Sequence, residues 1–178
     1  MLYTKVAIDS GPLKTGHSVR GIGAHTRELI GAVKDVISKK GGITVDSFDF
    51  SSTKSDKLSN YDVLHYTSFH PYFISLPSKK LAPKIILTIH DLIPLIYPRH
   101  YAPGVRGKIR FFINRLLIKK NVDKIITISE TSKKDICRFL DIEPSKVSVI
   151  YIAPKKSMKK LKPGVWENEL NEKYNLPK

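Results

Sequence analysis

The sequence has few of the residues and segments that mark several large classes of protein. Its 178 residues contain one cysteine, Cys137, so an internal disulfide is excluded and a reducing compartment is indicated. No apolar run approaches the roughly 18 residues of a membrane span, and the N-terminus leads into a strand pattern rather than a signal peptide. We therefore expect a cytoplasmic protein whose membrane contact would be peripheral, on the inner face.

Acidic residues are also scarce. There are 16 Asp and Glu residues against 31 Lys and Arg residues, which gives a net charge of +15. Such an excess favours an anionic partner, namely a nucleic acid, a membrane surface or a phosphorylated small molecule. The hydrophobic content of 41% and the charged content of 26% are ordinary for a soluble globular protein.

The common catalytic and metal-binding motifs are missing as well. The chain has no P-loop, no nucleophile elbow and no zinc pattern. Cys137 lies in the middle of a helical pattern, where packing is its expected role. Five of the histidines show no metal-ligand spacing, so we expect no metal site. They are His17, His25, His65, His70 and His100.

Strand and helix patterns alternate along the chain. Apolar or alternating runs predict strands at 6–9, 43–50, 62–66, 85–89, 124–128 and 147–152, and helical periodicity predicts helices at 24–40, 105–121, 131–140 and 166–173. This alternation predicts a doubly wound, mainly parallel α/β sheet with helices on both faces. We assign residues 1–154 to this domain and 155–178 to a linker toward a second domain.

Polar residues or glycines lie where several of these strands end. The loops that follow parallel strands share one edge of the sheet, so these groups are expected to surround one crevice. His90 and Asp91, after the apolar run 85–89, would form its floor. The other members of the predicted crevice are Gly21, Ile22, Gly23, Thr67, Ser68, Phe69, Ser129 and Glu130.

Each of these groups has a plainer interpretation. A histidine at a strand end is more often a hydrogen-bonded structural residue than a catalytic one. Gly21 and Gly23 could expose backbone N–H groups to an anion, or simply serve a turn. They do not match the dinucleotide fingerprint, because Thr26 stands where its third glycine would be.

The basic helix at 105–121 is the second informative feature. One apolar face, expected to dock on the sheet, contains Ile109, Phe112, Ile113, Leu116 and Leu117. The other side is expected to be either a solvated surface or a face for an anionic membrane. That outward set is Lys108, Arg110, Phe111, Arg115, Ile118 and Lys119.

Four stretches together resemble the N-terminal domain of family 4 retaining glycosyltransferases of the GT-B type. They are residues 20–30, 61–69, 88–94 and 126–135, in the order in which the family has them. The resemblance implies a Rossmann-like domain, the N-terminal half of a GT-B enzyme. In such enzymes this domain mainly holds the acceptor, and a second domain holds most of the nucleotide-sugar donor. No metal or other cofactor is implied.

The resemblance also implies roles for individual residues. Gly21 and Gly23 match the glycines that approach the donor diphosphate, and His90 matches the histidine that contacts the transferred sugar. Asp91 would support His90, and Ser129 with Glu130 would shape the cleft. The pair at 24–25, Ala-His, departs from the Arg-Tyr often found there, which leaves the sugar preference open.

The function expected from the resemblance is transfer of a sugar, with retention, from a nucleotide sugar to a glycan or lipid-linked acceptor. No carboxylate pair in the sequence suggests a two-carboxylate mechanism. The route that the resemblance implies is front-face displacement. The 178-residue chain alone is expected to be inactive. The alternatives are a basic nucleic-acid-binding domain, a GT-B-type sugar-nucleotide epimerase and an inert fragment, although we expect no nucleic acid to bind.

Overall fold

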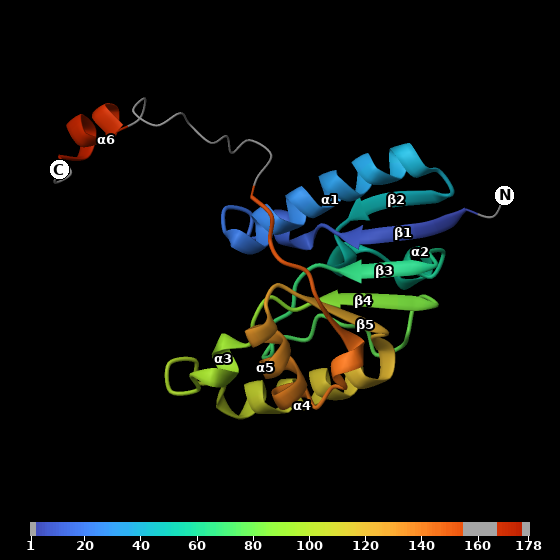
Figure 1. Ribbon diagram of the computed structural model, residues 1–178. Coiled ribbons are helices and arrows are strands. Elements are labelled where there is room, and N and C mark those ends of the chain that lie inside the picture. The colour runs from blue at the N-terminus through green and yellow to red at the C-terminus, as the bar shows by residue number, and fades with distance from the viewer. Residues whose placement is uncertain (1–2, 155–166, 176–178) are drawn as a thin grey trace.

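A single parallel sheet organises the protein, as the ribbon diagram shows (Figure 1). The computed structural model describes residues 3–154 and 167–175. All neighbouring strands are parallel, and the order across the sheet is β2-β1-β3-β4-β5-β6. The strands are β1 (Thr4–Asp9), β2 (Ile43–Phe48), β3 (Val63–Tyr66), β4 (Lys84–Thr88), β5 (Lys124–Thr127) and β6 (Val147–Val149).

The strand order reverses direction between β1 and β3. From β1 the chain moves outward to β2, then returns past β1 to β3 and continues to the other edge. Right-handed crossovers therefore put the helix after β1 on one face of the sheet and the later helices on the opposite face. Ligands of doubly wound sheets bind at such a reversal, beyond the carboxyl ends of the strands. The predicted Rossmann-like α/β fold is confirmed.

The connecting helices take up the positions that this topology requires. Helix α1 (Gly21–Lys40) lies beside β1 and β2, whereas α4 (Gly104–Asn121) and α5 (Glu130–Leu140) lie beside β4 and β5 (Figure 1). Two single-turn helices, α2 (Ser55–Leu58) and α3 (Ile93–Ile96), occupy connecting segments. The core is built from fully buried strand residues such as Leu64, Leu87 and Ile125.

Several predicted boundaries were wrong. Helix α1 begins at Gly21 rather than at residue 24, so the glycines lie in its first turn. Strand β2 ends at Phe48, and β6 ends at Val149, two and three residues before the predicted ends at 50 and 152. Ile150, Tyr151 and Ile152 are exposed, and the Ile150 N–H makes the last bond to β5, to the Thr127 carbonyl at 2.8 Å.

Helix α5 begins earlier than its pattern suggested, for a reason visible at its cap. The Ser129 hydroxyl accepts a hydrogen bond from the Ser132 backbone N–H at 3.1 Å. Thr131 and Ser132 therefore lie inside the helix. A serine at this position satisfies one of the N–H groups that the first turn leaves without a partner.

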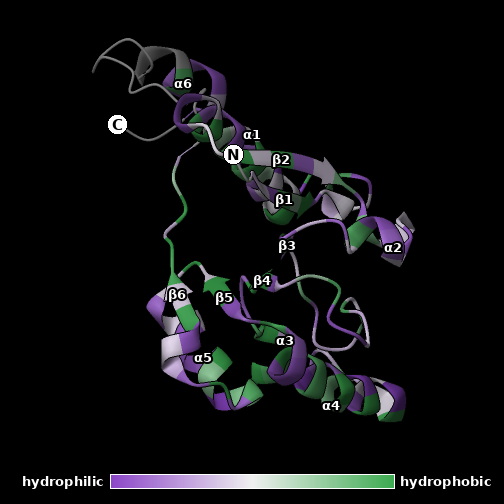
Figure 2. Cartoon of the chain, turned by 90° about the vertical axis from the view of Figure 1, so that its right-hand side faces the viewer, coloured by the Kyte–Doolittle hydropathy of each residue, from purple (hydrophilic) through white to green (hydrophobic). Residues whose placement is uncertain are grey.

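The predicted orientation of α4 was wrong for most of its apolar residues, although Leu117 packs against the core as predicted. Ile118, expected to face outward, is fully buried, and Phe111 packs against the core. Ile109 and Phe112, expected to face the sheet, are 55% and 60% exposed. The buried side carries Asn114 and Asn121, whose amide groups donate to backbone carbonyls of the loop between β3 and β4. Polar residues thus occupy the docked face of this helix, and hydrophobic and hydrophilic residues alternate along it (Figure 2).

The C-terminal segment is described only in part. Helix α6 (Glu167–Tyr174) agrees with the predicted helix at 166–173 to within one residue. Most of the predicted linker lies outside the described residues. The division at residue 154 stays a prediction.

Candidate active site at the strand ends

His90 lies just beyond the end of β4. The Ile89 N–H still donates to the carbonyl of Ile126 on β5 at 2.9 Å, so the sheet holds the chain until the residue before the histidine. His90 itself is partly buried. A side chain at this position is fixed by the sheet behind it and faces the edge at which ligands of such folds bind.

A second histidine packs directly on His90. His25, from α1, sets its ring at 87° to the His90 ring with the ring centroids 4.8 Å apart. This edge-to-face contact brings the first turns of α1 over the end of β4. Among the nitrogen atoms of the described residues, His25 Nδ1 and His90 Nε2 are buried without a hydrogen-bond partner.

A third histidine, His65 on β3, lies beneath this pair. Its Nε2 atom is 2.8 Å from the Thr88 hydroxyl on β4, and only 7% of the residue is exposed. Burial, with a smaller effect of His25, lowers the pKa of His65 to about 4. His65 is therefore neutral at physiological pH and supports the site from inside the sheet.

His90 is also neutral at physiological pH. Burial lowers its pKa, and the neighbouring His25 lowers it further, while a hydrogen bond to the Thr67 backbone and the charge of Asp91 act in the opposite direction. A histidine pKa is raised when the ring donates to a carbonyl. Since Nε2 has no partner, Nδ1 is the donor, and the Nε2 lone pair is left to accept a hydrogen bond.

The two glycines of α1 have different surroundings. A Cβ atom at Gly23 would lie 2.3 Å from the His17 carbonyl oxygen, and the Gly23 N–H already donates to that oxygen at 3.1 Å. Close packing therefore accounts for Gly23. No atom lies within 4 Å of the Cβ position at Gly21, and helix geometry leaves the N–H groups of Gly21 and Ile22 without an intrahelical acceptor. Room for an anion exists at Gly21 and not at Gly23.

The segment after β3 has one fully buried and two partly buried members. The Thr67 side chain is fully buried, and its hydroxyl donates to the Asp9 carbonyl at 2.8 Å, so it joins β1 to β3 and does not line the cleft. Ser68 is partly buried. Phe69 is also partly buried and packs against the core.

Asp91 and Ser129 act first as caps. The Asp91 carboxylate accepts from the Ile93 N–H at 3.0 Å, which shapes the turn into α3. Ser129 is the N-cap of α5, and Glu130 follows as the exposed first residue of that helix. Asp91 therefore shapes the loop after His90, and Ser129 is occupied by the helix that it begins. The roles expected of both at the cleft stay predictions.

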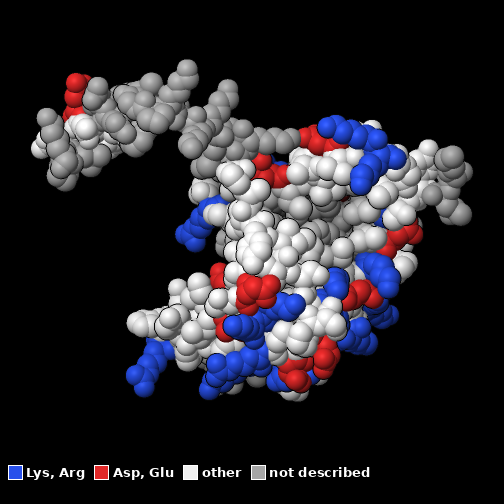
Figure 3. All heavy atoms as spheres, viewed as in Figure 1, with Lys and Arg blue, Asp and Glu red and all other residues white. Residues whose placement is uncertain are grey.

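The basic residues predicted on the outward face of α4 have different partners in the structure. Arg115 and Lys119 both pair with Asp141, Arg115 at 3.2 Å. Arg110 lies over the Phe73 ring, 6.0 Å from its centroid, and Lys108 is exposed. Basic side chains are more numerous over the α4 and α5 half than over the α1 half in the view of Figure 3.

Sequence reasoning missed the histidine cluster as a unit. His65 was considered as a metal ligand, and His25 as a metal ligand and as a departure from the family pattern, although His25 follows Gly21 by one helical turn and so shares its end of α1. Within the part of the chain that the structure describes, no group of three or more His, Cys, Asp or Glu residues could hold a metal ion. The cluster consists of neutral rings that pack on one another at the strand ends.

Comparison with known proteins agrees with the fold. The family model for Glycosyltransferase Family 4 matches residues 19–153. Three Escherichia coli sequences, each named serotype-specific mannosyltransferase WbdA, are 27% identical over 124 residues. The alignment covers 65% of this chain but only 14–15% of those proteins, so the chain spans a small part of their length. The match over most of the sheet confirms the resemblance, and the chain belongs to glycosyltransferase family 4 as an N-terminal domain of the family's type.

Proposed function

We propose that this domain serves transfer of a sugar, with retention, from a nucleotide-sugar donor to a glycan or lipid-linked acceptor. Family membership supports glycosyl transfer in general. The name of the WbdA relatives makes mannose the first sugar to test. The strand-end site of this domain would contact the transferred sugar and the acceptor, and a second domain would hold most of the donor.

The unpartnered Nε2 atom of His90 is the observation that carries this proposal. It is buried at the end of β4, on a ring held by His25 and by the Thr67 backbone. A neutral imidazole in this state accepts a hydrogen bond from a sugar hydroxyl without having to lose a proton or rotate. The contact would orient the transferred sugar as charge develops at its anomeric carbon.

The first turn of α1 would supply charge stabilisation. The N–H groups of Gly21 and Ile22 and the positive end of the helix favour a phosphate oxygen. In a front-face displacement, the bond from the anomeric carbon to the diphosphate breaks while the acceptor oxygen bonds to that carbon on the same face. The leaving diphosphate takes the proton from the acceptor hydroxyl. The protein then contributes orientation and electrostatics rather than a nucleophile.

The test replaces His90 in the full-length protein and measures transfer from radiolabelled nucleotide sugars. His90→Ala should lower turnover by about 100-fold or more, as for loss of one transition-state contact. His90→Phe keeps an aromatic ring against His25 but lacks the nitrogen, so it should be equally impaired. Near-normal turnover of folded His90→Phe would contradict a role for Nε2 and assign His90 to packing.

Peripheral contact with an anionic membrane is a further part of the proposal, but through the opposite face of α4 from the one predicted. Five apolar residues on this face are 38–75% exposed: Val105, Ile109, Phe112, Ile113 and Leu116. With about 3.6 residues per turn, they form a stripe opposite Asn114 and Ile118. No described helix is long and apolar enough to span a membrane.

Charge on both sides of this stripe favours a lipid surface as its partner. The helix carries six Lys or Arg residues and no Asp or Glu. Lys108 borders one side of the stripe and Arg106 the other. Apolar residues flanked by cations suit an interface of anionic headgroups, where each cation contributes on the order of 1 kcal/mol and salt weakens the attraction.

Co-sedimentation with vesicles tests this contact. Binding should require phosphatidylglycerol in phosphatidylcholine vesicles and fall several-fold when Ile109, Phe112 and Leu116 are changed to Ser. Val36→Ser removes an apolar residue of α1 that is 51% exposed and should leave binding unchanged. Equal binding to neutral vesicles would contradict the proposal. So would a stripe variant that binds vesicles as the wild type does but turns a dimer into a monomer, because the partner of the stripe would then be a second copy of the chain.

A further inference from the structure

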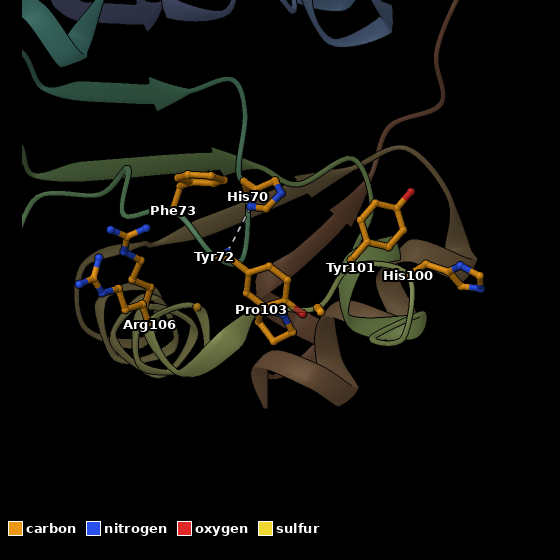
Figure 4. Close-up of a pocket in the computed structure, with 10 residues that line it drawn as sticks. His70, Tyr72, Phe73, His100, Tyr101, Pro103 and Arg106 are labelled. Atoms are coloured by element: carbon orange, nitrogen blue, oxygen red, sulfur yellow. Dashed lines mark hydrogen bonds between the residues drawn. The ribbon is translucent and has the colours of Figure 1, made fainter.

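An open cavity lies beside the strand-end site, between the loop after β3 and the start of α4. Its volume is about 400 Å³, within the roughly 300–1,000 Å³ of ligand pockets. Figure 4 shows His70, Tyr72 and Phe73 from the loop, Arg106 from the helix, and Tyr101 at the other end of the cavity from Arg106. The site described above uses none of these residues.

The charge in this cavity is one-sided. Arg106 and Arg110 stand four residues apart on α4, so their side chains share one side of the helix. Of the described residues that line the cavity, none is Asp or Glu, and neither arginine has an ion pair within the described part of the chain. Two guanidinium groups with unused donors match the oxygens of a phosphate.

The remaining wall is aromatic. Phe73 is 60% exposed and Tyr101 is 48% exposed, which is high for large aromatic side chains. Exposed rings beside polar donors give the apolar C–H face of a sugar a surface on which to lie. Arg110 lies over the Phe73 ring, so the cationic and aromatic parts of the wall meet.

His70 adds a directed donor between these two parts. Its Nδ1 atom accepts from the Tyr72 N–H at 3.2 Å, drawn as the dashed line in Figure 4. In the neutral ring the proton is therefore on Nε2, which can donate to a hydroxyl or a phosphate oxygen. The His70 ring also packs against the Phe73 ring, with the ring centroids 4.8 Å apart, and this contact fixes the orientation of the imidazole.

The wall is rigid before any ligand arrives. The fully buried Asn114 amide donates to the carbonyls of Pro71 and Phe73, both at 2.9 Å, and so ties the loop to α4. The Tyr72 hydroxyl donates at 3.0 Å to the carbonyl of Pro94, in the segment that follows His90. A direct hydrogen bond therefore joins the cavity wall to α3, the short helix that follows His90.

From these contacts we infer that the cavity is an acceptor subsite for a sugar that carries a phosphate or diphosphate group. Arg106 and Arg110 bind the phosphate, Phe73 and Tyr101 contact the sugar ring, and His70 donates to one of its oxygens. The inference rests on the proposed function and specifies the acceptor class for the same edge of the sheet. The phosphate could belong to a lipid headgroup or to a free sugar phosphate.

Binding without donor tests the subsite by isothermal titration calorimetry on the full-length protein. The ligands are mannose 1-phosphate, the same sugar phosphate esterified to a long alkyl chain, a neutral alkyl mannoside and inorganic phosphate. We expect both sugar phosphates to bind at least ten-fold more tightly than the neutral mannoside and than inorganic phosphate. A further gain from the alkyl chain would identify a lipid headgroup as the source, and equal affinity would identify a free sugar phosphate.

Matched variants separate a local site from general charge. Arg106→Gln with Arg110→Gln should weaken both sugar phosphates about ten-fold and leave the neutral mannoside unchanged. Lys39→Gln with Lys40→Gln removes the same charge from the last turn of α1 and should change neither. Equal loss in the two pairs, no loss in the arginine pair, or inorganic phosphate binding as tightly as the sugar phosphates would overturn the inference.

Transfer assays on the same variants keep this result distinct from the proposed function. If the sugar phosphate binds as expected but no nucleotide sugar is ever turned over, the proposed function fails and the subsite remains. If the arginine pair transfers sugar to every acceptor as the wild type does, the subsite fails and the proposed function remains.

Discussion

Helices α4 and α5 pack on neighbouring strands, yet α4 buries asparagine amides beside Ile118, whereas α5 buries mainly aliphatic side chains. Helix α5 buries Ile136 and Leu140 and keeps its charges in solvent. Helix α4 buries Asn114 and Asn121 and leaves Phe112 exposed. Helix α4 has six basic and no acidic residues, whereas α5 has three basic and two acidic residues.

The difference follows from what each helix faces. Helix α5 packs against strands whose backbone groups are already paired, so apolar side chains complete the interface. Helix α4 also faces the irregular loop between β3 and β4, whose carbonyls have no ladder partner. The amides of Asn114 and Asn121 satisfy the carbonyls of Pro71, Phe73 and Pro77. A helix that packs against a loop needs donors where a helix that packs against a sheet needs apolar groups.

The largest effect should come from the apolar interface of α5. Leu140→Ala removes a fully buried side chain and should lower the free energy of unfolding by about 2–5 kcal/mol. Urea denaturation followed by circular dichroism measures the change. A loss below 1 kcal/mol would mean that α5 does not depend on its apolar face, and the contrast with α4 would disappear.

The polar interface of α4 should contribute less, but clearly. Asn114→Ala leaves the carbonyls of Pro71 and Phe73 without their donor and should cost about 1–3 kcal/mol in the same denaturation experiment. Asn114→Leu, which restores volume without the donor, should not recover the loss. Full recovery by leucine would show that the asparagine acts by filling space.

A smaller effect is expected where the two helices meet. Lys119, with help from Arg115, lowers the pKa of the exposed Asp141 carboxyl. The stabilisation this provides is present above the pKa of the unfolded state and is lost as the pH falls through the lower folded-state pKa. Asp141→Asn keeps a residue that tolerates the left-handed backbone at this position (φ 55°). Its unfolding free energy should fall less than that of the wild type between neutral and acidic pH, and parallel pH profiles would show that the pair contributes nothing.

The smallest effect on stability should come from the apolar stripe of α4. Phe112→Ser should change the unfolding free energy by no more than about 0.5 kcal/mol, because the ring is 60% exposed. The sequence pattern makes the opposite prediction, since it assigns Phe112 to the core. A loss of about 2 kcal/mol or more would restore the sequence interpretation and reverse the assigned faces of α4.

Much of the strand-end site could be predicted because it depends on local order. The apolar run before His90 predicted a buried strand, and the positions of the other strand ends followed from parallel topology. The contact of His25 with His90 could not be predicted in the same way, because it depends on the packing of α1 across the end of β4. The same limit applies to Gly23, whose constraint comes from the His17 carbonyl.

What the sequence alone determined here was the class of fold, the order of strands and helices, and the family. Apolar runs and cap residues act within a few positions of themselves, so they can be seen without any tertiary contact. The tertiary structure alone decided which face of α4 is buried, which histidines meet, and that Arg106 shares a cavity with Phe73. Helical periodicity shows that a helix has an apolar side, but the neighbouring backbone decides which side it needs. In α4, unpaired loop carbonyls required amide donors, and the apolar side was left facing out.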